Sequence, residues 1–259
     1  MSLPQAAPAE TAPRPAGRLI AIASGKGGVG KTWFAITLAH VLARAGQRVL
    51  LFDGDLGLAN VDIQLGLAPV RDLGALLAGR TGLAETVLRY AVGGFDILPG
   101  CAGSGALAGL DAAQLDPVVA LLRDAAMYRH VLLDLGAGLE AGVRSLAAAA
   151  DTLLVLATDE PTSLTDAYAV LKLHSIDRPR GDARIVVNLA ANPAAGQRTY
   201  ATLRKAAQAF LRRDPPLAGV IRRDERVRDA IRRQTPLLAR YPNCAAGADV
   251  ERIAATLGL

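Results

Sequence analysis

The stretch Gly25–Thr32 reads GKGGVGKT and fits the pattern GxxxxGK[ST]. A short apolar run, Leu19–Ala23, precedes it, and a helical pattern, Lys31–Ala45, follows it. Glycines let the backbone curl so that its N–H groups point at phosphate oxygens, and the following helix adds its positive N-terminal end. This context predicts a phosphate-binding loop between a strand and a helix.

Two side chains of this loop carry specific expectations. Lys31 is expected to reach the β- and γ-phosphates of ATP, and Thr32 is expected to place its hydroxyl on Mg²⁺. The backbone around the phosphates is expected to come from Gly25, Gly27, Gly28, Val29 and Gly30. The alternative is a glycine-rich turn that holds no ligand.

Short apolar runs alternate with longer helical patterns along the rest of the chain. The expected strands are Leu19–Ala23, Arg48–Phe52, Phe95–Leu98, His130–Asp134, Thr152–Ala157, Arg184–Asn188 and Ala218–Ile221. The expected helices are Lys31–Ala45, Leu115–Ala126, Glu140–Ala149, Ser163–Leu173, Thr202–Leu211 and Ala248–Leu257. Strands separated by helices predict an α/β fold with a mainly parallel sheet and helices on both faces.

Length and composition set the class of protein. The chain has 259 residues, of which 51% are hydrophobic and 20% charged, so it can build a sizeable core and is not wholly disordered. No apolar run approaches the roughly 18–20 residues of a membrane helix, and the first residues lack a signal-peptide pattern. Two separate cysteines without a CxxC exclude a disulfide scaffold. We expect a cytoplasmic protein with a disordered Ala/Pro-rich tail over 1–17 and a single domain over 18–259.

Three carboxylates lie at the ends of expected strands. Asp134 follows an apolar run and has the layout of a Walker B carboxylate, which would hold Mg²⁺ through water. Asp53 and Asp55, two positions apart, can engage the metal shell and orient the attacking water. The alternative is that each of them caps a helix or a turn. Their joint presence beside a phosphate-binding loop favours the functional interpretation.

Asn188 closes another expected strand. A carboxamide at the edge of a sheet can pair with both N6 and N7 of adenine, so Asn188 is a candidate to hold the base of ATP. Capping of the strand end is the alternative.

The loop contains a second lysine, Lys26, and with it resembles the deviant Walker A ATPases, which include the MinD and ParA families. The resemblance implies a P-loop NTPase fold of the MinD/ParA type, with ATP and Mg²⁺ as cofactors and slow hydrolysis that serves a molecular switch. It also implies a homodimer formed with ATP, in which Lys26 crosses to the partner's nucleotide, and it makes Asp55 the hydrolytic residue. A second cation at the γ-phosphate would stabilise charge in the transition state. The alternative is a solvent-facing lysine in a loop.

Two longer stretches, Asp55–Leu67 and Asp159–Tyr168, resemble the FlhG group (also called FleN) of MinD-like ATPases, which control the number and position of flagella. The resemblance covers the chain from Arg18 to its C-terminus. It implies a flagellar partner such as the GTPase FlhF, a flagellar regulator or a basal-body component, and peripheral contact with the inner membrane or cell pole. The tail offers only Gln5-Ala6 where family members carry a DQAxxLR motif that stimulates FlhF. The pattern at 249–257 reads as the last helix of the fold, not as an amphipathic membrane helix.

A basic segment leaves other functions open. The net charge is +5, and arginines gather between Arg204 and Arg240. Such a face can bind DNA, as a ParA-type partition ATPase would, or it can be a solvated surface. A MinD-type regulator of the division site is a further alternative.

Overall fold

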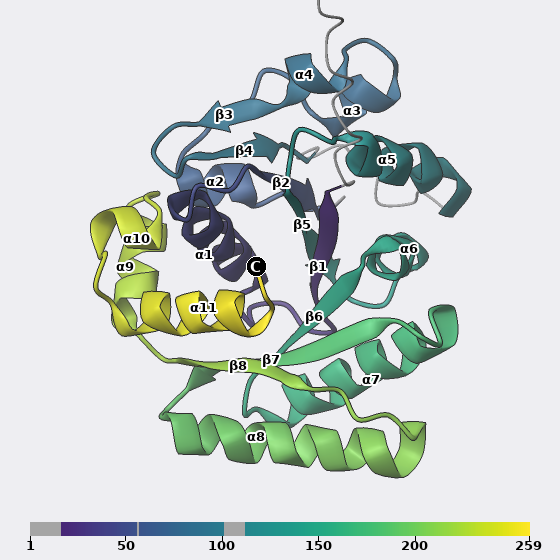
Figure 1. Ribbon diagram of the computed structural model, residues 1–259, viewed down its shortest axis with the longest axis vertical. Coiled ribbons are helices and arrows are strands. Elements are labelled where there is room, and N and C mark those ends of the chain that lie inside the picture. Colours follow the sequence, from purple (N-terminus) through teal and green to yellow (C-terminus); the bar gives the residue numbers. More distant parts are fainter. Residues whose placement is uncertain (1–16, 56, 101–111) are drawn as a thin grey trace, which may run out of the picture.

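The computed structural model describes residues 17–55, 57–100 and 112–259, and its centre is an eight-stranded sheet (Figure 1). The strand order is β3-β4-β2-β5-β1-β6-β7-β8. The bounds are β1 Arg18–Ser24, β2 Val49–Gly54, β3 Leu88–Tyr90, β4 Phe95–Leu98, β5 His130–Ala137, β6 Thr152–Ala157, β7 Asp182–Ala190 and β8 Leu217–Arg222. Every described neighbouring pair is parallel except β3–β4. The predicted mainly parallel α/β fold is confirmed.

Helices cover both faces of the sheet, as Figure 1 shows. One apolar cluster joins the sheet to α1 (Lys31–Arg44), α9 (Glu225–Arg232), α10 (Leu237–Arg240) and α11 (Ala245–Thr256). The other joins it to α5 (Ala112–Asp124), α6 (Ala141–Ala149), α7 (Pro161–Asp177) and α8 (Pro193–Ala206). Alternate residues of β1 enter different clusters, Ile20 and Ile22 the first, Leu19 and Ala21 the second. A strand covered on both faces is therefore apolar throughout.

Short elements complete the described part of the chain: α2 (Val61–Leu65), α3 (Leu73–Leu77), α4 (Leu83–Thr86) and the π-helical turn η1 (Ala207–Leu211). All seven predicted strands are present. The sequence analysis missed β3, an edge strand in which only Tyr90 is buried, because three residues carry too little periodicity. In the described residues, no helix is long and apolar enough to cross a membrane.

Helix α8 begins nine residues earlier than predicted, at Pro193 instead of Thr202. The side chain of Asn192 accepts a hydrogen bond from the N–H of Ala195 at 2.8 Å, and proline occupies the first helical position. These are ordinary helix-start signals, but this first part of the helix is largely exposed and lacks an apolar stripe. The remainder of the predicted segment, up to Leu211, is the end of α8 and η1.

Ion pairs occupy much of the basic segment. Arg204 binds Asp214, and Arg233 and Arg240 both bind Asp229. Arg222 binds Asp249 on α11, whose carboxylate is 1% exposed and also accepts the main-chain N–H of Arg222 at 2.9 Å. These arginines hold the C-terminal elements together, so they are not a uniform field of free charge.

The Arg222–Asp249 pair gives a prediction about stability. Replacement of Asp249 by Ala removes the carboxylate that pairs with the Arg222 guanidinium and accepts its main-chain N–H, so the free energy of unfolding should fall by about 3 kcal/mol. The matched control is Arg223→Ala, because Arg223 is exposed, and its change should stay within about 0.5 kcal/mol. Urea denaturation followed by circular dichroism measures both. Equal stability of the two variants would contradict the structural role.

Candidate nucleotide site

The carboxyl ends of three adjacent strands bring the candidate residues to one edge of the sheet. The phosphate-binding loop follows β1, Asp53 lies near the end of β2, and Asp134 lies on β5 between them. The register pairs Asp53 directly with Asp134. Parallel strands place the loops that follow them at the same edge, which is where α/β proteins bind ligands.

The hydroxyl of Ser24, which the sequence analysis did not single out, forms hydrogen bonds with residues of the phosphate-binding loop. Lys31 Nζ donates to Ser24 Oγ at 3.0 Å, and Ser24 Oγ donates to the carbonyl of Lys26 at 2.7 Å. Gly30 has φ of 94°, and a Cβ there would lie 2.6 Å from Nδ2 of Asn188. Position 30 therefore requires glycine both for its backbone conformation and for the close approach of Asn188.

Two buried acids, Asp53 and Asp134, lie at this edge, and their pKa values are raised. Asp53 is 1% and Asp134 2% exposed. Burial raises the pKa of Asp53 to about 7, against the opposing effect of three main-chain N–H groups. Burial and the neighbouring Asp53 also raise the pKa of Asp134. Burial lowers the pKa of Lys31, although the charge of Asp134 acts in the opposite direction. Burial thus shifts all three groups toward their neutral forms, and a compensating charge would oppose that shift.

A magnesium ion fits this arrangement. Oδ1 of Asp134 is buried and has no hydrogen-bond partner within the described residues, so it is a carboxylate oxygen available for a cation or its water shell. No group of three or more His, Cys, Asp or Glu side chains could hold a metal in the described part of the chain. Mg²⁺ commonly needs only one or two carboxylates, because phosphates and waters supply its other ligands.

Asp53 also organises the loop that follows it. Its Oδ2 accepts the N–H groups of Asn60 and Val61, both at 2.9 Å, at the start of α2. Asp55 turns back on its own loop, where Oδ1 accepts the N–H of Leu58 at 2.9 Å. A Cβ on Gly136 would lie 3.3 Å from this carboxylate, so the loop after β2 lies against the end of β5. Asp53 thus makes the cap contacts of the structural alternative, and its contact with Mg²⁺ stays a prediction.

Lys26 makes an ion pair within the chain. Its Nζ donates to Glu160 Oε2 at 2.6 Å and to Thr162 Oγ1 at 3.0 Å, both at the start of α7. The pair is exposed, with 38% of the lysine and 61% of the glutamate side chain accessible, so solvent screening keeps its contribution to stability small. A bond this weak can be exchanged for a phosphate. The sequence analysis did not anticipate it, because 134 residues separate the partners.

Asn188 lies at the phosphate-binding loop, 1% exposed. Its Nδ2 donates to the carbonyl of Val29 at 2.8 Å, and its Oδ1 accepts the N–H of Leu189 at 2.8 Å. The amide therefore ties the end of β7 to the loop, as the capping alternative requires. One amide hydrogen and one oxygen lone pair remain for a base, so contact with adenine stays a prediction.

Residues 20–237 match the family model described as the CobQ/CobB/MinD/ParA nucleotide binding domain. The chain belongs to the MinD/ParA family. The predicted family and fold are therefore confirmed, and with them the ATPase class and its cofactors, ATP and Mg²⁺.

Two curated relatives have flagellar names. The chain is 38% identical to the antiactivator FleN of Pseudomonas aeruginosa over 238 residues, which cover 92% of this chain and 85% of FleN. It is 33% identical to the flagellum site-determining protein YlxH of Helicobacter pylori over 74% of this chain and 64% of YlxH. The predicted resemblance to the FlhG group, also called FleN, is confirmed.

Solved structures of MinD proteins share the fold. The septum site-determining protein MinD of Pyrococcus horikoshii, complexed with Mg-ADP, has a TM-score of 0.77 at 26% identity and covers 93% of this chain and 96% of its own. MinD in the MinC:MinD complex of Aquifex aeolicus has a TM-score of 0.74 at 26% identity and covers 94% of this chain and 96% of its own. In the second of these structures MinD is in complex with MinC. The roles of single residues in this chain stay predictions.

The position of Lys31 gives a prediction about chemistry. Lys31→Ala removes the cation at the centre of the loop, so ATP hydrolysis should fall at least about a hundredfold and ADP affinity should drop. The wild-type rate itself should lie below about 10 s⁻¹, since a switch has an incomplete transition-state clamp. Lys205→Ala on α8 is the control, because it removes an exposed lysine away from the loops. Phosphate release and calorimetry are the measurements; unchanged hydrolysis by Lys31→Ala would place the site elsewhere.

Proposed function

We propose that this chain is an ATP-dependent dimerising switch that controls the number or placement of flagella. The observation that carries the proposal is the 38% identity to FleN over 92% of the chain. The site supports the switch itself, because Asp55 in the loop after β2 lies against Gly136 at the end of β5, beside a phosphate-binding loop. Contacts made only by a γ-phosphate can order such loops.

Each charged side chain has a part in the proposed reaction. Lys31 binds phosphate oxygens, and Asp55 accepts a hydrogen bond from the attacking water and orients it toward the γ-phosphate. Thr32, Asp53 and Asp134 hold Mg²⁺, which neutralises charge on the phosphate oxygens when it is bound. Because both acids are buried with raised pKa values, the incoming cation also favours their ionised forms.

Dimerisation follows from the second lysine. Lys26 leaves Glu160 and Thr162 and binds the nucleotide of the partner subunit, so that two copies enclose two ATP molecules. The exposure of the Lys26–Glu160 pair supports this exchange, since breaking the bond costs little. ADP lacks the γ-phosphate that repays the cost, and the ADP form stays monomeric.

A measurement of molar mass tests the dimer. Asp55→Ala should slow hydrolysis and trap a dimer in ATP, whereas Lys26→Ala should remain monomeric while binding ATP in its own site. Size-exclusion chromatography with light scattering in ATP and in ADP gives the result. A monomer of Asp55→Ala in saturating ATP would refute nucleotide-dependent dimerisation.

A deletion strain tests the cellular role. Loss of this protein should change the number or position of flagella without moving the division septum or impairing plasmid inheritance. Electron microscopy of cells, with the Lys31→Ala allele beside the deletion, provides the count. Normal flagella with misplaced septa would favour a MinD-type role instead.

DNA binding is the alternative that the basic segment raises. Random duplex DNA with and without ATP, at low and high salt, distinguishes it, because phosphate contacts give a steep salt dependence. Arg222 is unsuitable for charge reversal because it pairs with the buried Asp249. The exposed Arg223 and Arg232 are suitable instead. Steeply salt-dependent binding lost in these variants, together with normal flagella, would favour a partition ATPase.

A further inference from the structure

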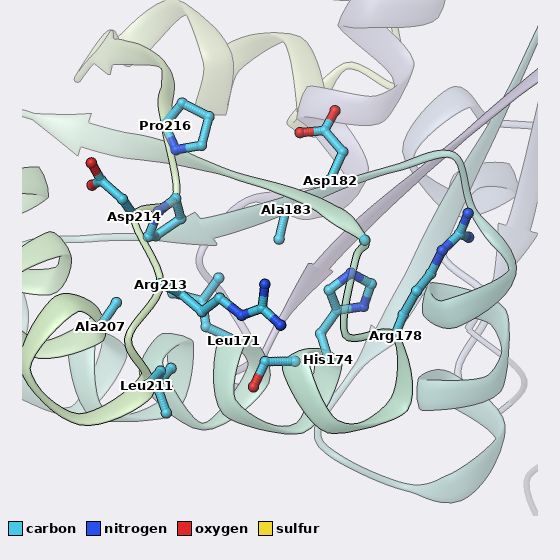
Figure 2. Close-up of a pocket in the computed structure, with 13 residues that line it drawn as sticks. Leu171, His174, Arg178, Asp182, Ala183, Ala207, Leu211, Arg213, Asp214 and Pro216 are labelled. Atoms are coloured by element: carbon cyan, nitrogen blue, oxygen red, sulfur yellow. The ribbon is translucent and has the colours of Figure 1, made fainter.

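A cavity of about 200 Å³ lies at the opposite edge of the sheet from the nucleotide loops. It is formed by the last turns of α7, the start of β7, η1 and the segment that leads into β8 (Figure 2). Helix α7 begins beside Lys26 and ends at this cavity; its 17 residues span about 25 Å. The cavity is therefore distinct from the candidate nucleotide site.

The walls of the cavity are apolar on one side and polar on the other. Apolar surface comes from Leu171, Ala183, Ala207, Leu211 and Pro216. The polar side includes His174, Arg178 and Arg213, and Figure 2 shows the Arg213 side chain extending toward His174. A pocket of this kind suits a ligand with an apolar body and one polar group.

His174 is the unexplained group. The residue is 6% exposed, and neither Nδ1 nor Nε2 has a hydrogen-bond partner within the described residues. A Cβ on Gly181 would lie 2.5 Å from Nε2, so the ring is seated against a backbone that only glycine permits. A buried imidazole without partners is costly, and a group in the adjacent cavity would supply one.

The charge around the cavity is positive. The guanidinium groups of Arg178 and Arg213 donate to main-chain carbonyls, that of Arg178 to Ala148 at 2.7 Å and also to Ala150, and that of Arg213 to Pro179. Carbonyls do not neutralise these charges. Two carboxylates also line the cavity, and both already have cationic partners: Asp214 binds Arg204, and Asp182 binds Arg184. Asp177, outside the lining, binds Arg144. Figure 2 shows the carboxylates of Asp182 and Asp214 turned away from the space between Arg213 and His174.

The backbone beside the cavity is irregular in two ways. The turn η1 is π-helical, and Arg212, the residue that ends it, has φ of 53°. A non-glycine residue in the left-handed region and a π-helical turn are both unusual, and both occur frequently at functional sites. Together they direct the chain so that the next residue, Arg213, lines the cavity.

We propose that this cavity binds a small organic anion, a carboxylate on a compact apolar body, with the carboxylate at Arg213 and His174. A 150 Å³ apolar cavity accommodates benzene, so this larger one has room for a ring with a carboxylate. Burial and then the charge of Arg178 lower the pKa of His174; Arg213 acts in the same direction, and Asp177 and Asp182 oppose them. A bound carboxylate adds a negative charge beside the ring and offsets both arginines.

Benzoate and its neutral counterpart benzamide test the proposal directly. The full-length protein is titrated with each in saturating Mg-ADP, which keeps the phosphate-binding loop occupied, and two-dimensional NMR follows the amides around the cavity. Benzoate should bind with millimolar affinity and shift amides of α7, β7 and η1, while benzamide should bind at least about tenfold more weakly. No benzoate binding, or equal binding of benzamide, would overturn the proposal.

Two neighbouring arginines provide matched variants. Arg213→Gln removes a charge that lines the cavity and should weaken benzoate at least about tenfold. Arg212→Gln removes the same charge one residue away, outside the lining, and should change affinity less than about threefold. Both residues are exposed, so neither variant should alter the melting temperature appreciably. An equal effect of the two substitutions would mean that benzoate responds only to the general positive charge, and no effect of either would mean that Arg213 does not bind it. Either result would refute the proposed site.

Discussion

The facing carboxylates of Asp53 and Asp134 are the constraint on which the nucleotide end of this molecule depends. Parallel pairing of β2 with β5 places them opposite each other, between two apolar layers that exclude water. Two buried acids so close cannot both be ionised cheaply, and their pKa values rise. Lys31 and three main-chain N–H groups offset part of the cost. The rest depends on charge brought by a ligand, so the site responds to what binds there.

That response can reach the surface through two connections. Asp53 accepts the first N–H groups of α2, and the carbonyl of Ile63 on the same helix accepts Nε2 of Gln234 at 2.9 Å, between α9 and α10. Lys26 reaches the start of α7 through Glu160 and Thr162. A rearrangement of the phosphate-binding edge would therefore change hydrogen bonds at the starts of α2 and α7.

The parallel sheet separates two chemistries. Its carboxyl edge gathers glycine-rich loops, acids and lysines, whereas its amino edge near β7 and β8 gathers arginines, a buried histidine and an apolar wall. Helix α7 runs from one edge to the other and contributes side chains at both ends. The two chemistries therefore lie at opposite ends of one continuous helix.

Local sequence patterns determined the order of the secondary-structure elements and the place of the nucleotide site. The sequence alone predicts the phosphate-binding loop and the order of strands and helices. It also predicts that Asp53 and Asp134 lie at strand ends. Each of these predictions depends on residue spacing within a segment of less than about 15 residues. Tertiary structure decided the contacts between distant segments: Lys26 with Glu160, Arg222 with Asp249, and Asn188 with Val29. It also decided that His174 would face a cavity and that Asp53 would cap a helix as well as face Asp134. Periodicity reports which face of an element is buried, but only the packed chain decides which charges and donors meet there.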